Sequence, residues 1–186
     1  MNYLDQYFKQ NPKINFQNGI EEETPFSQID YNLIGVAKHI CGCAFDLSLA
    51  CILNHKNVDK IKAVSMATCC HHNCRIEFLN NFRFYSEYLN LSVRDIILLF
   101  KATSWIFGPI NVENSDEVKD SQDNLKTNHI FLKKGLSKKF VGLIAKYVVD
   151  LTRVFFLISK NFKVYYLKYC DNEITTENNL ILGIKK

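Results

Sequence analysis

The sequence predicts an α/β domain that ends in an antiparallel strand pair. Short apolar runs at residues 33–37 and 61–68, each bounded by polar or glycine-containing segments, are typical of buried parallel strands. Residues 140–158 repeat apolar side chains at helical spacing. Two more strand-like runs, 162–169 and 179–184, lie on either side of a polar turn. Strands that alternate with helices and close in a hairpin indicate an α/β domain.

The remaining elements follow from local patterns of apolar and turn residues. A short strand is expected at 13–16, and Asn18-Gly19 after it is a turn signal. Helices are expected at 45–53, 78–89 and 93–105, the last of them ended by Gly108-Pro109, and the final hairpin turns at Asp171-Asn172. Residues 111–129 are polar without apolar periodicity, which predicts a flexible surface loop.

Composition places the chain among ordinary globular domains. Its 186 residues suit one domain, and 47% hydrophobic with 23% charged residues argues against a disordered or fibrous protein. Residues 1–5 lack the basic start of a secretory signal, and charged residues interrupt the most apolar stretches, so no membrane contact is expected. The seven cysteines form no regular framework, which favours reduced thiols in the cytoplasm or nucleus.

Positive charge is concentrated in the last third of the chain. Residues 133–186 contain eleven Lys and Arg against four Asp and Glu. Such an excess is expected where a protein contacts nucleic-acid phosphates. Lys139, Lys146 and Arg153 lie seven residues apart on the long helix and are the expected RNA contacts. A solubilising basic face is the alternative interpretation.

Two clusters of reactive side chains each follow a predicted strand. The sequence KHICG occupies 38–42, and CCHHNC occupies 69–74. Because parallel strands end at one edge of their sheet, where open α/β folds bind ligands, the clusters are expected to share a site.

The second cluster has three interpretations. A zinc site needs about four converging ligands, but neighbouring residues of an extended strand point to opposite faces, so no metal is expected there. A Cys/His nucleophile is equally compatible with the residue types. The simplest interpretation makes Cys69 and Cys70 small core thiols and turns only His71 and His72 toward the cleft.

Five segments of the chain, taken together, resemble one known family. In order, they are KHICGCAFDL at 38–47 against KHLCG-x-A-T-D-L, CCHHNC at 69–74 against CCHH-x-C, TSWIFG at 103–108 against S-W-A-x-G, KYVVDLTR at 146–153 against K-x-x-x-D-x-G-R, and TTEN at 175–178 against T-x-E-N. These patterns are those of the eukaryotic tRNA acceptor-stem 2′-O-ribose methyltransferases of the "Trm-thirteen" type.

The resemblance implies a Rossmann-like, S-adenosylmethionine-dependent methyltransferase domain. Such an enzyme moves a methyl group to a ribose 2′-hydroxyl at position four of the tRNA acceptor stem, so tRNA is the expected partner. A ribose hydroxyl is a very weak acid that the protein must align and help to deprotonate. The roles implied are positioning or proton transfer for Lys38, His39 and Asp46, cofactor binding for Asn18, Cys41 and Gly42, and RNA contact for His71 and His72 with the three basic helix residues.

The chain also departs from the family pattern. None of its glycines forms the Gly-x-Gly of the family's cofactor loop, Arg75-Ile76 replaces an Asp-Trp pair, and Thr152 replaces a glycine. Asn18 stands at a position that is acidic in the family. The family's N-terminal zinc motifs have no counterpart either, so zinc is expected only in that missing part.

The chain therefore resembles an N-terminally truncated, C-terminal half of the family enzyme. We expect an incomplete cofactor site, no activity of the isolated chain, and a missing N-terminal half that acts as a separate chain. The alternatives are a non-catalytic RNA-binding remnant, an incomplete gene product, or a metal- or thiol-dependent enzyme built on the Cys/His cluster.

Overall fold

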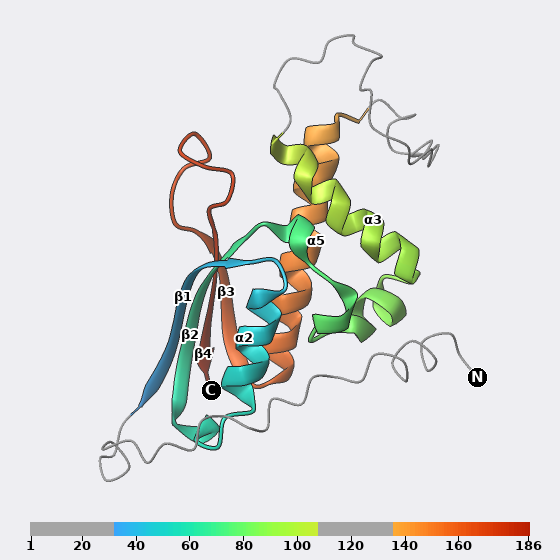
Figure 1. Ribbon diagram of the computed structural model, residues 1–186. Helices are drawn as coiled ribbons and strands as arrows, with labels where there is room; N and C mark the ends of the chain where they lie inside the picture. The colour runs from blue at the N-terminus through green and yellow to red at the C-terminus, as the bar shows by residue number, and fades with distance from the viewer. Residues whose placement is uncertain (1–31, 108–135) are drawn as a thin grey trace, which may run out of the picture.

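The computed structural model describes residues 32–107 and 136–186 (Figure 1). The predicted strand at 13–16, Asn18 and the predicted loop at 111–129 lie outside the described residues. Within the described part, no helix combines the length and the apolar character needed to cross a membrane.

A four-stranded mixed sheet forms the centre of the domain. Its strands are β1 (Leu33–Cys41), β2 (Ile61–Cys69), β3 (Phe162–Lys168) and β4 (Asn179–Lys185), in the spatial order β1-β2-β4-β3. β1 and β2 are parallel, and β4 runs antiparallel to both β2 and β3. The predicted α/β class and the antiparallel final pair are confirmed. The hairpin differs in that residues 169–178 form a longer connection than a tight turn at Asp171-Asn172.

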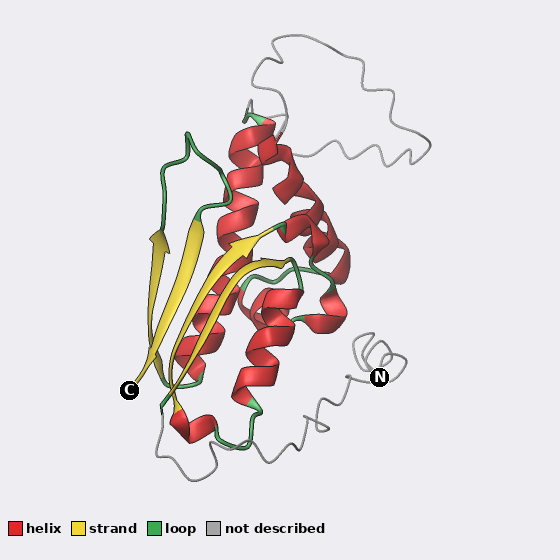
Figure 2. Cartoon of the chain, turned by 60° about the vertical axis from the view of Figure 1, so that its left-hand side comes forward, coloured by secondary structure: helices red, strands yellow, loops and turns green. Residues whose placement is uncertain are grey.

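Two helices cover one face of this sheet. α2 (Ala44–Leu53) connects β1 to β2, and α5 (Lys138–Ser159) precedes β3; both lie on the same side of the strands (Figure 2). The core between them is apolar and consists of Phe45, Leu49, Ile61, Val64, Met66, Leu157, Phe162 and Ile181. On the opposite face, Ile34 and Val36 of β1 remain exposed to solvent, and no described helix covers them.

A second helical layer packs on the far side of α5. α3 (Val93–Thr103) begins at a capping box, in which Ser92 and Asp95 bond each other's backbone N–H, and continues into the short η6 (Ser104–Phe107). α5 approaches this pair closely at Gly142, where a Cβ atom would lie 2.9 Å from the Ala102 carbonyl oxygen. Glycine is therefore required for this contact.

The predicted helix at 78–89 is present only in part, because helical residues cover 82–88 and not 79–81. The 3-10 turn η4 (Ile76–Phe78) precedes this gap, and the π-helical turn η5 (Phe84–Tyr88) forms most of the helical part. Between them the Asn80 side chain donates to the Asp46 carbonyl and Asn81 to the Thr152 carbonyl. These bonds fix the segment between α2 and α5, and tertiary contacts override its aromatic-rich periodicity.

Candidate functional site

The end of β1 contains a bulge that exposes Lys38 and His39. The strand extends beyond the predicted 33–37 run to Cys41, and its register against β2 shifts between Ala37 and Ile40. His39 has a φ of 62°, in the left-handed region that few residues other than glycine adopt. Lys38 and His39 therefore lie at a bulge within the strand, where both side chains are exposed. The Lys38 ammonium lies 5.8 Å from the centre of the Tyr169 ring.

Gly42 fixes the turn between β1 and α2 against the segment that follows β2. Its φ is +53°, and a Cβ atom at this position would lie 2.6 Å from the backbone of Asn73. Its N–H donates to the Cys69 carbonyl at 3.0 Å, which joins the two strand ends. The conformation and the close approach both require glycine.

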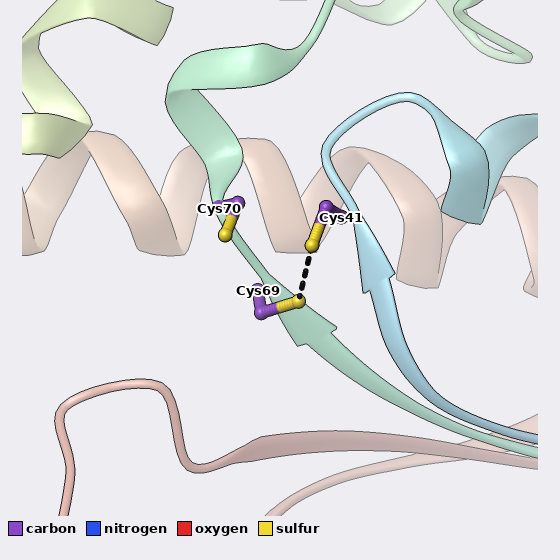
Figure 3. A group of neighbouring side chains, drawn as sticks. All are labelled: Cys41, Cys69 and Cys70. Carbon is purple, nitrogen blue, oxygen red and sulfur yellow. Dashed lines mark hydrogen bonds between the residues drawn. The ribbon is translucent and has the colours of Figure 1, made fainter.

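The residue after β2 also has a left-handed backbone. Cys70 has φ 48° and ψ 46° and precedes the 3-10 turn η3 (His71–Asn73). This conformation interrupts the alternation of side chains along the strand, so the Cys69 and Cys70 thiols both approach Cys41 (Figure 3). The alternation argument that separated Cys69 from Cys70 is therefore wrong. The expectation that the two strand-end clusters meet is confirmed for these thiols.

Arg153 of α5 is the centre of a buried network of charges. Its guanidinium donates to Asp46 Oδ2 at 2.9 and 3.1 Å and to the Gly42 carbonyl at 2.8 Å. The Phe45 ring covers it at 4.5 Å. Burial alone would lower the pKa of Arg153, but the Asp46 carboxylate and other neighbours outweigh burial and raise it. The residue stays charged although it is only 2% exposed.

Asp150, one helical turn before Arg153, is fully buried. Its Oδ1 lies 2.6 Å from His71 Nε2, and its Oδ2 accepts from Thr68 at 3.0 Å and from Tyr166 at 2.8 Å. Burial would raise the pKa of this carboxyl, but His71, Arg153 and the hydrogen bonds together hold it well below its usual range. Asp150 is therefore a buried carboxylate whose oxygens are all engaged.

His71 connects this carboxylate to a second ion pair. Its Nδ1 lies 3.8 Å from Glu177 Oε2, and Lys146 Nζ lies 3.2 Å from the same oxygen. Lys146 also donates to the Thr176 carbonyl and is only 1% exposed. We call the residues that are joined in this way the buried network; its members are Asp46, His71, Lys146, Asp150, Arg153 and Glu177.

The structure corrects the expected basic stripe on α5. Lys139 is exposed, but Lys146 and Arg153 face the interior, where carboxylates from distant segments compensate their charge. A seven-residue spacing drifts by only about 20° per heptad, so the three residues do share one side of α5. That side faces the interior at Lys146 and Arg153 and is exposed only at Lys139, in the first turn of the helix. Neither Lys146 nor Arg153 is available to phosphates, and RNA contact by them is withdrawn.

The two histidines of the second cluster also separate. His71 is buried and bonded, whereas His72 is exposed beside Phe107. The expectation that both face a cleft is wrong for His71. Asp46, expected to act on the substrate, is buried against Arg153.

Sequence reasoning assigned no site role to Asp150, Glu177, Tyr166 and Asn179. Asp150 had a local signal, because it is an acidic residue inside an otherwise apolar helical repeat. Tyr166 and Asn179 had none: both hydrogen-bond to Asp150 across the β3–β4 pair, which only the fold brings together.

Cys69 and Cys74 lack the properties of a nucleophile. Burial, followed by the neighbouring Cys41 thiol, raises the pKa of Cys69 to about 12, and burial raises that of Cys74 to about 12. A thiol nucleophile requires the opposite shift.

The described residues contain no Gly-x-Gly loop of the kind through which backbone approaches a nucleotide. A cavity of about 170 Å³ lies at the opposite end of the sheet, lined by Leu53, Val58 and Phe162 among others. Cys41 and Gly42 lie at the other end of the sheet, where β1 ends.

Comparison with known proteins identifies the family. The model of the family described as methyltransferase TRM13 matches residues 21–184. Proteins named "tRNA:m(4)X modification enzyme TRM13" are similar to the chain: that of Scheffersomyces stipitis is 29% identical over 154 residues, covering 78% of this chain and 36% of the relative. The Kluyveromyces lactis protein is 29% identical over 172 residues, with 82% and 36% covered. The Saccharomyces cerevisiae protein is 26% identical over 202 residues, with 90% and 39% covered.

The chain thus spans little more than a third of the length of these curated relatives. No solved structure matches it. The mixed α/β sheet is observed, and its Rossmann-like character stays a prediction.

Proposed function

Because the chain belongs to the TRM13 methyltransferase family, we propose that it forms part of an enzyme that methylates tRNA. In more detail, the enzyme transfers a methyl group from S-adenosylmethionine to a ribose 2′-hydroxyl in the acceptor stem. The tRNA is the one partner in this proposal, because the comparisons give no support to a separate N-terminal chain.

The observation that carries the proposal is the convergence of the motif segments. Four of the five family-like segments contribute to the buried network: Asp46, His71, the Lys146–Arg153 helix face and Glu177. The network lies behind the C-terminal ends of two parallel strands, the usual position of ligand sites in open α/β sheets. The motifs that this chain has in common with the family therefore build one site, which supports a function in common with the family.

The exposed bulge supplies the groups that reach the substrate. Lys38 carries a positive charge suited to a phosphate or to the ribose oxygen, and the His39 imidazole is able to accept the hydroxyl proton. Asp46 acts through Arg153, which holds the Gly42 carbonyl and so fixes the turn after the bulge. It is a positioning residue.

Exposed lysines of the basic C-terminal third extend the RNA surface. Lys139, which is exposed at the start of α5, is retained as an RNA contact, and exposed lysines at 138 and 168 join it. His72 lies on the rim of the strand ends and is retained as well. Binding through phosphates predicts that the logarithm of tRNA affinity falls with the logarithm of salt concentration, by about 0.7–0.9 per phosphate neutralised.

A segment exchange tests the reaction. Residues 21–184 replace the matching segment of the S. cerevisiae relative, and the product is incubated with tRNA and methyl-labelled S-adenosylmethionine. We expect a 2′-O-methylated nucleotide in the acceptor stem. His39→Ala is expected to lower the transfer rate by about 100-fold or more, as for loss of a proton acceptor. The matched control is Lys62→Ala, an exposed residue on the same sheet.

Three outcomes contradict the proposal. They are methylation of a base, binding of S-adenosylmethionine and tRNA without transfer, and full activity of His39→Ala. The second outcome would favour a non-catalytic RNA-binding protein. Calorimetry on the isolated chain adds a check, because an incomplete cofactor site predicts no micromolar binding of S-adenosylmethionine.

A further inference from the structure

Three thiols meet where β1 and β2 end. Cys41 is the last residue of β1, Cys69 the last of β2, and Cys70 follows it (Figure 3). Cys41 and Cys69 are register partners, and their sulfur atoms lie 3.6 Å apart. All three Sγ atoms lie within 4.8 Å of one another. The cluster combines a residue from the first motif segment with two from the second.

We propose that Cys41, Cys69 and Cys70 form a binding site for a soft divalent cation, Zn²⁺. The inference does not depend on methyl transfer, and it assigns Cys41 to a metal in place of S-adenosylmethionine. Three thiolates are ligands that zinc prefers.

The separations of the sulfur atoms fit this ion. A zinc–sulfur distance of about 2.3 Å in tetrahedral geometry places two ligand sulfurs about 3.8 Å apart. The Cys41–Cys69 pair at 3.6 Å is close to this value, and a pair at the 4.8 Å limit requires a side-chain adjustment of about 1 Å. Cys41 is exposed, so the fourth position faces solvent and is open to water.

The backbone conformation at Cys70 favours a site with three thiol ligands and not a disulfide between two of the thiols. A disulfide between Cys41 and Cys69 would leave Cys70 without a role. Cys70 reaches the group only because its backbone is left-handed, a conformation that residues with a side chain rarely adopt. Burial and the adjacent sulfurs raise the pKa of Cys69 to about 12, so this thiol loses a proton when it binds a metal. Metal binding therefore releases protons and strengthens as pH rises.

Cobalt titration of the full 186-residue chain tests the site. The reduced, metal-free protein is titrated with Co²⁺ without oxygen, and then with Zn²⁺. We expect one Co²⁺ per chain, with thiolate charge-transfer bands and the intense visible bands of tetrahedral cobalt, which zinc abolishes stoichiometrically. Cys41→Ser is expected to weaken binding by more than about 100-fold, beyond the 10–100-fold cost of losing an outer-shell contact.

Matched variants separate this set of ligands from others. Cys51→Ser removes an exposed thiol of α2, and His72→Ala removes the exposed imidazole of the same motif; both are expected to bind Co²⁺ as the parent chain does. Circular dichroism of each metal-free variant reports folding, and the exposed Cys41 keeps the test usable if Cys69→Ser unfolds.

The proposal is overturned by the absence of tetrahedral cobalt bands in the folded chain. Unchanged affinity in Cys41→Ser, or lost affinity in His72→Ala, overturns it as well. A third result also overturns it: peptide mapping finds a disulfide between Cys41 and Cys69, and the reduced chain binds no Co²⁺. In that case the two thiols would be a redox-active pair and not metal ligands.

Discussion

The buried network and the exposed rim of the strand ends use neighbouring residues of the same motifs in opposite ways. We define the rim as Lys38, His39, Cys41 and His72, all exposed. His71 and His72 are adjacent in sequence, but one bonds Asp150 in the interior and the other faces solvent. The motif residues therefore divide into two groups: the buried network holds the site in place, and the rim is open to ligands. Substitutions in the two groups should therefore have different consequences for stability.

Loss of Arg153 is expected to have the largest effect. Arg153→Met leaves the carboxylates of Asp46 and Asp150 buried without their shared cation, and should reduce the free energy of unfolding by about 3–5 kcal/mol. Urea denaturation followed by circular dichroism measures the loss. Arg83→Met, which removes an exposed arginine with a 3.8 Å ion pair, is the control and should cause little change. Equal losses of unfolding free energy in the two variants would show that the ion pairs of Arg153 do not stabilise the fold.

Acid is expected to weaken the network next. The folded pKa of Asp150 lies below its unfolded value of about 3.9, so the folded state binds fewer protons in acid. Its contribution is therefore complete well above pH 4 and is lost as pH falls through the lower, folded pKa. Unfolding free energies measured from about pH 7 to about pH 3 should decline less steeply in Asp150→Asn than in the parent. If the unfolding free energies of the variant and the parent fall equally with pH, Asp150 is not the cause of the acid sensitivity.

Removal of one hydroxyl gives a smaller, sharper test. The Tyr166 hydroxyl donates to Asp150 at 2.8 Å and accepts from Asn179. Tyr166→Phe should cost about 1–2 kcal/mol, because buried polar partners lose a hydrogen bond. Tyr165→Phe changes the adjacent residue, whose ring lies on the other face of the sheet, and should be neutral. Equal losses in the two would show that strand propensity, and not the network, is responsible.

Substitutions in the rim should have the smallest effect on folding. Lys38→Ala and His39→Ala remove exposed side chains, so each is expected to change the free energy of unfolding by less than about 0.5 kcal/mol. The same changes should strongly reduce methyl transfer in the assembled enzyme. A loss of stability comparable to that of Tyr166→Phe would contradict the division between network and rim.

Local patterns alone predicted much of the fold. Apolar runs located β1 and β2, helical spacing located α5, and the last two runs located the antiparallel pair. The predicted helix at 78–89 begins only at residue 82, because Asn80 and Asn81 hydrogen-bond to the backbone of Asp46 and Thr152, which are distant in sequence.

The sequence by itself determined the order of strands and helices, the reactive residue types and the motifs that identify the family. Only the tertiary structure decided which of those residues are buried. Lys146 and Arg153 are interior because carboxylates from two other segments, Glu177 and Asp46, neutralise them, and no spacing within α5 reveals those partners. The thiols converge because the backbone at Cys70 turns left-handed, which overrides the alternation that a strand would impose.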